Sequence, residues 1–259
     1  MRRFFIYLVY FCDFALAQPW SAVIPVTQGA ASVMSNPVFM LTDTLAVHRT
    51  EACLSHTSKL MMRELAESHA MLSFRIGKND AIGLGCSYEG YDLFHTSRTA
   101  LGYAKKLSKE VAIATRMELH SIRQGDGYGN GHAFTSALGA QWQMSDQLMA
   151  GFAIHNPNRS PMRDLRTPMW FGTSLHWRVG RQATILLGAE KNDIDKPNYV
   201  LQADYDPSNR LSIRLGVSSG FEPISLAFGF RLASMELIAH SSYHEVFGFS
   251  PGATIRLFK

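Results

Sequence analysis

Apolar and polar residues alternate strictly along residues 209–232, NRLSIRLGVSSGFEPISLAFGFRL. A turn at Ser219-Gly220 separates two alternating halves. Period-two alternation over two adjacent segments predicts a β-hairpin with one apolar face. Each segment has about ten residues, roughly the length of a tilted strand that crosses a bilayer. The apolar positions are Leu211, Ile213, Leu215 and Val217, followed by Ile224, Leu226, Phe228 and Phe230.

The same alternation recurs from Leu45 to the end of the chain and predicts about fourteen strands. An even number is typical of bacterial single-chain barrels. Short connections also alternate with longer ones, as expected when turns lie on one rim and loops on the other. Short turns are expected at residues 78–80, 107–109, 145–146, 180 and 206–209, and longer loops at 58–67, 123–132, 156–168 and 192–197. We therefore predict an all-β fold, a transmembrane antiparallel up-and-down β-barrel over residues 45–259.

Closure into a barrel follows from the cost of bare backbone groups in lipid, which is several kcal/mol for each unpaired N–H or C=O. The apolar face then contacts lipid and the other face lines the interior. Aromatic residues near the predicted strand ends fit the two interfacial girdles of such barrels: Tyr88, Tyr103, Trp142, Trp177, Tyr199, Tyr205 and Tyr243.

The first 44 residues do not follow this pattern. Arg2 and Arg3, an apolar stretch and the Ala15-Leu16-Ala17 site predict a signal peptide over residues 1–17, and hence export to the bacterial outer membrane. Residues 18–44 are irregular and are expected to form a plug in the lumen. After this leader, no run of about 18 apolar residues predicts a transmembrane helix. The mean hydropathy of −0.04 agrees with alternating strands, whose averages cancel.

The predicted interior holds charges of both signs, and this mixture suggests ladders of ion pairs. Because polar interiors are normal in such barrels, a structural role is the favoured interpretation over a role in selectivity. The lumen-lining candidates are Arg75, Glu89, Arg98, Arg116, Glu118, His120, Glu190, Asp204, Arg214, Arg231, Glu236, His240 and Arg256.

Other predicted interior positions carry little or no side chain, so another backbone segment can approach them closely. We expect the plug to pack there. The alternative is that glycine only eases the curvature of the strands. The plug-contact candidates are Gly83, Gly85, Ala100, Gly102, Gly139 and Gly151.

Catalytic, cofactor and metal chemistry finds little support in the residue pattern. Cys53 and Cys86 fall on non-consecutive strands, so we expect both to remain thiols. His-x-Ser triplets such as His240 with Ser242 could pair a base with a nucleophile, but they arise easily in a chain with ten histidines. No His, Cys and Asp group has metal-ligand spacing along the chain. We therefore expect no enzymatic activity, no cofactor and no metal. The net charge of +4, or +3 without Arg2, Arg3 and Asp13, does not indicate nucleic-acid binding.

Several motifs, in order, carry a resemblance over nearly the whole mature chain. They are Gly29-Ala30-Ala31 and Asn36-Pro37, the 59–64 loop before a Ser-Phe strand, GLGCSYEGY (83–91), IRQGDGYGNGHAF (122–134), HNPNR (155–159) and SSYHEVFGFSPG (241–252). The chain resembles the small FadL-type barrels of Bacteroidetes, a group that includes PorV of the type IX secretion machinery. The resemblance implies fourteen strands with an N-terminal hatch in the lumen.

Two functions remain open. One is a FadL-like channel for passive uptake of small or partly apolar solutes. The chain is shorter than the fatty-acid transporters, and this argues against a long-chain lipid as the substrate. The other is a PorV-like scaffold that does not transport. The expected partners are outer-membrane lipid and, for the scaffold, secretion-system or surface proteins.

Overall fold

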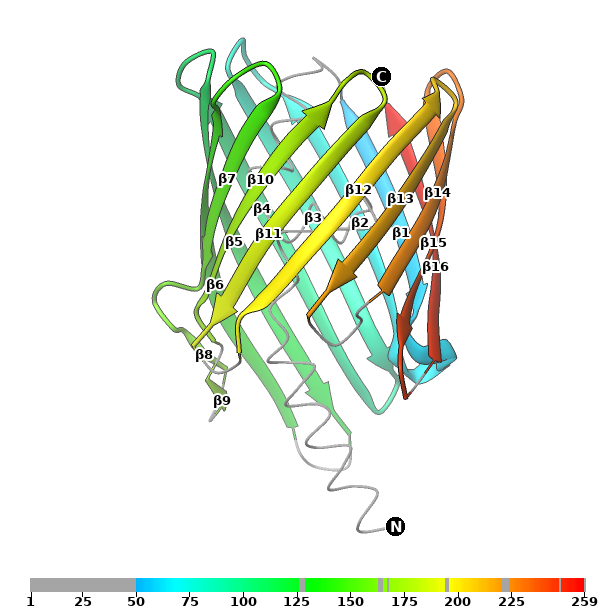
Figure 1. Ribbon diagram of the computed structural model, residues 1–259. Coiled ribbons are helices and arrows are strands. Elements are labelled where there is room, and N and C mark those ends of the chain that lie inside the picture. The colour runs from blue at the N-terminus through cyan, green and yellow to red at the C-terminus, as the bar shows by residue number, and fades with distance from the viewer. Residues whose placement is uncertain are drawn as a thin grey trace.

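Fourteen antiparallel strands close into one barrel in the computed structural model, with β1 paired to β16 (Figure 1). The structure describes residues 50–125, 129–162, 165–166, 168–193, 196–219, 224–246 and 248–258. The predicted signal peptide and plug, residues 1–17 and 18–44, lie outside this range. The number of strands and their antiparallel order confirm the predicted fold class.

Every barrel strand pairs with its neighbour along the chain, apart from the interruption by β8 and β9 between β7 and β10. The barrel strands are β1 (Glu51–Ser58), β2 (Ala66–Arg75), β3 (Asp80–Tyr91), β4 (Phe94–Lys106), β5 (Val111–Gln124), β6 (Gly129–Gln143), β7 (Leu148–His155), β10 (Trp170–Val179), β11 (Ala183–Asn192), β12 (Asn198–Ser208), β13 (Leu211–Ser218), β14 (Ile224–Arg231), β15 (Met235–His244) and β16 (Gly248–Phe258).

The two rims of the barrel differ. The first residue of β1 pairs with the end of β16, so both lie on one rim, which we call the terminal rim. The short turns after β2, β4, β6, β10, β12 and β14 lie there as well. The opposite rim, called the loop rim, holds the longer connections after β1, β7 and β11. The short turns on the terminal rim and the three longer connections agree with the prediction, but the loop rim also holds the short connection between β3 and β4, residues 92–93.

The connections on the loop rim contain short elements of their own. Two 3-10 turns, η1 (Lys59–Met61) and η2 (Arg63–Leu65), join β1 to β2. The amide of Leu60 donates to Ser250 Oγ at 2.9 Å, which ties η1 to β16. Between β7 and β10 a small separate hairpin forms from β8 (Pro161–Met162) and β9 (Leu165–Arg166).

Two predicted connections are wrong in their bounds. Residues 123–132 were expected as a glycine-rich loop, but β5 continues to Gln124 and β6 begins at Gly129, where φ is +75°. Gln124 pairs with Gly129, so the connection between the two strands is shorter than the predicted loop. The turn expected at 206–209 is displaced, because β12 continues through Ser208. The register shifts between Tyr205 and Ser208, where Pro207 has no N–H to donate to the ladder.

The two faces of the barrel wall are sharply different. Large apolar residues at alternating positions point outward and are exposed, for example Leu84 (46%), Leu101 (52%) and Leu215 (55%). A continuous exposed apolar band of this kind is the surface expected to contact acyl chains. The predicted girdle residues lie near the strand ends: Tyr103, Trp142, Trp177 and Tyr205 toward the terminal rim, and Tyr88, Tyr199 and Tyr243 toward the loop rim. Among the described residues, no helix is long and apolar enough to span a membrane.

Candidate functional site

The inner face is built from the residues that alternate with this outer band. On β3, β4, β5, β6, β7 and β10, one band of inner-face positions carries only alanine and glycine. Cross-strand pairing brings these residues together: Gly83 lies opposite Gly102, and Gly85 opposite Ala100. A second row of small residues runs across six strands through direct cross-strand pairs, in the order Ala81, Ala104, Ala114, Gly139, Ala153 and Gly172. We call this set the small-residue wall; it comprises Ala81, Gly83, Gly85, Ala100, Gly102, Ala104, Ala114, Gly139, Ala153 and Gly172.

The small-residue wall contains five of the six plug-contact candidates. The sixth, Gly151, pairs with Gln141 and Ser174 on the neighbouring strands. Of the six, Gly139 is half-buried and the other five are buried. Because residues 18–44 lie outside the described range, their packing against these positions stays a prediction.

The opposite side of the inner face carries a charged network near the terminal rim. Its centre is Glu236 on β15, which is 2% exposed. The Glu236 carboxylate accepts from Arg231 Nε at 3.0 Å and from Arg256 Nη1 at 3.1 Å, and Arg214 Nη2 lies 4.0 Å away. Each arginine also contacts a second carboxylate. Arg256 lies 2.7 Å from Glu51, Arg231 lies 3.1 Å from Asp206, and Arg214 lies 3.9 Å from Asp204. We call these seven residues the terminal-rim network.

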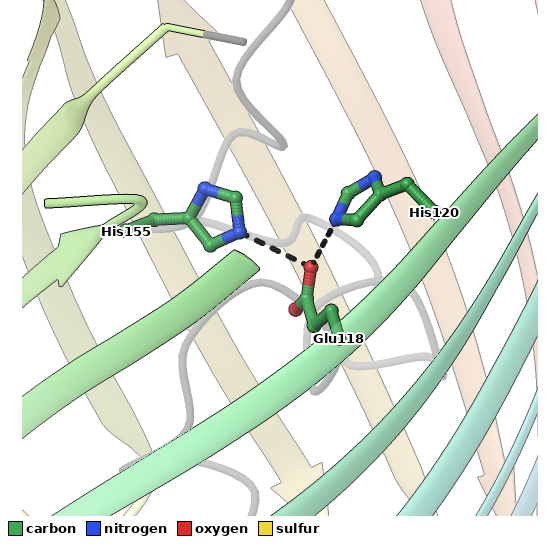
Figure 2. A group of neighbouring side chains, drawn as sticks. All are labelled: Glu118, His120 and His155. Carbon is green, nitrogen blue, oxygen red and sulfur yellow. Dashed lines mark hydrogen bonds and ion pairs between the residues drawn. The ribbon is translucent and has the colours of Figure 1, made fainter. Parts of the chain in front are cut away.

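A second polar group has members on β5, β6 and β7. Figure 2 shows three of them, Glu118 and His120 of β5 and His155 of β7. Glu118 Oε2 lies 2.8 Å from His120 Nε2 and 3.1 Å from His155 Nε2. The other carboxylate oxygen, Oε1, pairs with Arg116 Nε. Thr135 Oγ1 completes the group, 3.0 Å from His120 Nε2 and 3.3 Å from His155 Nε2. Arg116, Glu118 and His120 were candidates from the sequence, whereas Thr135 and His155 were not.

At the loop rim, Lys59 bridges two carboxylates of adjacent strands. Its Nζ lies 3.0 Å from Glu67 Oε2 and 2.6 Å from Glu89 Oε1. Burial by itself would lower the pKa of the Lys59 ammonium, but the attraction of Glu67 and Glu89 outweighs it and raises the pKa above its ordinary value. Lys59 therefore stays charged around neutral pH and holds the β1–β2 connection against the inner wall.

The remaining candidates lie apart from these groups. Arg75 donates to the carbonyls of Gly77 and Lys78 in the turn after β2. Glu190 accepts from Asn198 Nδ2 at 2.5 Å. His240 lies against Gly252, where an added Cβ would be 2.2 Å from the imidazole Cε1.

Arg98 lies opposite His120 on the adjacent strand β4. The sequence thus indicated which face these side chains occupy, and the fold decided which of them meet.

A pocket of about 360 Å³ lies on the outer surface, lined in part by Leu148, Leu175 and Ile185 of β7, β10 and β11. These residues belong to the apolar band, so this hollow faces the expected acyl chains and not the lumen. Cys53 is buried on the inner face of β1 and Cys86 is exposed on the outer face of β3. They are not joined by a disulfide, as predicted.

The closed barrel, apolar outside and polar inside, is the architecture of bacterial outer-membrane barrels. Comparison with solved structures agrees. The fold is similar to the toluene transporter TodX of Pseudomonas putida, with a TM-score of 0.61, 10% identity, and coverage of 94% of this chain and 95% of TodX. A FadL homologue of Pseudomonas aeruginosa gives 0.56 and 10%, over 93% of this chain and 95% of the homologue.

Omp33 of Acinetobacter baumannii is similar as well, at a TM-score of 0.52 and 8% identity over 81% of this chain and 96% of Omp33. At these identities the likeness concerns the fold alone. No family model matches the sequence, and no curated protein matches it either. The resemblance to FadL-type barrels therefore holds for the fold, whereas membership of a particular sequence family stays a prediction.

Proposed function

We propose that this chain is an outer-membrane channel for passive uptake of small, partly apolar solutes. The observation that supports this proposal is the division of the inner face. The small-residue wall of β3 to β10 offers apolar surface with little side-chain bulk. The terminal-rim network offers charged hydrogen-bonding groups on the other side. A solute with an apolar body and a polar end has suitable partners on both sides.

The fold comparison gives independent support by analogy. TodX is described as a toluene transporter, and one of its variants as a monoaromatic hydrocarbon channel. Fold alone does not define function, so the solute class rests on the inner face of this chain. On this proposal the signal peptide is removed, the terminal rim faces the periplasm and the loop rim faces the outside.

Liposome swelling tests the proposal directly. The chain without residues 1–17 is folded into lipid vesicles, and solute entry is followed by light scattering with sugars and with small aromatic alcohols. Entry of the aromatic alcohols above the rate of protein-free vesicles is expected. Deletion of residues 18–44 is expected to raise the rate, because that segment is proposed to restrict the lumen.

A matched pair of variants separates lumen effects from folding effects. Ala153→Phe adds bulk to the small-residue wall, whereas Ile154→Phe adds it to the lipid face of the same strand, β7. Only Ala153→Phe should reduce the uptake rate. Equal rates in both folded variants would contradict passage along that wall. If the folded protein admits no solute, even without residues 18–44, the channel is refuted and the non-transporting scaffold is favoured.

A further inference from the structure

Two imidazoles and one carboxylate converge on a single point of the inner face (Figure 2). His120 Nε2 and His155 Nε2 lie 2.8 and 3.1 Å from the same oxygen, Glu118 Oε2. All three potential ligand atoms lie within 4.8 Å of one another. We propose that Glu118, His120 and His155 form a binding site for one divalent late transition-metal ion, with zinc as its typical occupant. This inference is independent of the proposed solute uptake.

The register of the sheet explains why these residues meet. Glu118 and His120 are two residues apart on β5, so their side chains share one face. His155 enters from β7, and β6 lies between the two strands. On β6 its cross-strand neighbour is Ala137, which has no side chain long enough to separate His155 from β5. The ligand set therefore depends on a small residue in the intervening strand.

The two separations from Glu118 Oε2 are close to what zinc requires, and the two imidazole nitrogens lie within 4.8 Å of each other. Zinc binds imidazole nitrogen and carboxylate oxygen at about 2.0–2.2 Å, usually with tetrahedral geometry. Ligand atoms at such a site are separated by roughly 3.3 Å, which follows from those bond lengths. The separations of 2.8 and 3.1 Å need to open by only a few tenths of an ångström. Thr135 Oγ1, next to both imidazole nitrogens, marks the side where a fourth ligand or a water would lie.

A hydroxyl–imidazole–carboxylate relay is the competing interpretation of the same residues. Such a relay uses the two different nitrogens of one imidazole, one for the hydroxyl and one for the carboxylate. Here both Thr135 Oγ1 and Glu118 Oε2 face the same nitrogen of His120, Nε2. His155 shows the same arrangement. In the structure both Nε2 atoms are hydrogen-bonded to Glu118 Oε2. Because the three atoms lie within 4.8 Å of one another, one ion could replace these hydrogen bonds with three bonds to the metal.

Nearby positive charge limits the affinity of the site, and the types of ligand set its selectivity. Arg116 pairs with Glu118 Oε1 and thereby orients Oε2 toward the imidazoles, in the way that partners of metal ligands usually do. Its charge, and that of Arg98 opposite His120, oppose a bound cation. We therefore expect weaker binding than at a structural zinc site with four protein ligands. Two imidazoles favour zinc, nickel or copper over magnesium and calcium, which prefer oxygen ligands.

Isothermal titration of the full mature chain, folded in detergent, with zinc chloride tests the site. One equivalent of zinc should bind, and magnesium chloride should give no signal. His155→Asn is the principal variant, because the His155 side chain is the most accessible of the three at 17%. It should weaken zinc binding by about tenfold or more. His240→Asn on β15, which removes another inward-facing histidine, should leave the affinity unchanged.

Cobalt provides a second readout on the wild-type protein. Binding of cobalt chloride should produce the visible absorption of a four- or five-coordinate ion, and His155→Asn should abolish it. Absence of saturable zinc binding by the folded wild-type chain would overturn the proposal. So would an affinity that His155→Asn leaves unchanged, or one that His240→Asn lowers equally. None of these readouts depends on solute passage, so the proposed metal site and the proposed channel can each be refuted without the other.

Discussion

Replacement of Glu236 by glutamine removes the central negative charge of the terminal-rim network with little change in shape. The arginines around it, Arg214, Arg231 and Arg256, then keep one carboxylate each. Removal of one partner from a buried ion pair typically costs about 3–5 kcal/mol. Because every arginine retains a partner, we expect the lower end of that range, about 3 kcal/mol of unfolding free energy.

Asp206→Asn is the matched control. Asp206 contacts Arg231 at 3.1 Å, the same arginine that Glu236 contacts at 3.0 Å. Its side chain, however, is 43% exposed, compared with 2% for Glu236. Exposed ion pairs contribute at most about 1 kcal/mol. The two variants therefore separate the effect of burial from the effect of losing a partner of Arg231.

Reversible urea unfolding in lipid vesicles, followed by tryptophan fluorescence, measures both variants. The unfolding midpoint should fall much further for Glu236→Gln than for Asp206→Asn, with an unchanged dependence on urea concentration. Equal losses for the two variants would show that burial does not set the value of these contacts. That result would refute the assignment of Glu236 as the centre of the network.

Three further predictions concern the two faces of the wall. Leu215→Arg places a charge on the outer face near mid-strand and should cost about 2–4 kcal/mol in the same unfolding assay, whereas a loss below about 1 kcal/mol would contradict contact with the bilayer core. Gly252→Ala should cost about 1–3 kcal/mol, since its Cβ would lie 2.7 Å from the carbonyl oxygen of His56; wild-type stability would contradict this close approach. In folded protein, maleimide labelling followed by mass spectrometry should modify the exposed Cys86 much faster than the buried Cys53; similar rates would contradict their opposite faces.

The alternation of residues was sufficient to predict the barrel. It correctly separated outward Leu211, Ile213 and Leu215 from inward Ser212 and Arg214, because successive side chains of a strand point to opposite faces. The strand count and the two rims followed from the same pattern and from turn residues. Boundaries were less reliable where glycine or proline allowed a strand to continue, as in the 123–132 and 206–209 connections.

The groups of the inner face depended on tertiary structure. Alternation says which face a side chain occupies, but a strand shifted by two residues keeps its faces and changes all its neighbours. Only the register brings Glu236 between Arg231 and Arg256. Likewise His155, which is 37 residues from Glu118 along the chain, reaches it only because β7 lies beside β6 with Ala137 opposite. Spacing along the sequence thus predicted no metal ligands, since the third ligand comes from another strand and is brought to Glu118 and His120 only by the pairing of β5, β6 and β7.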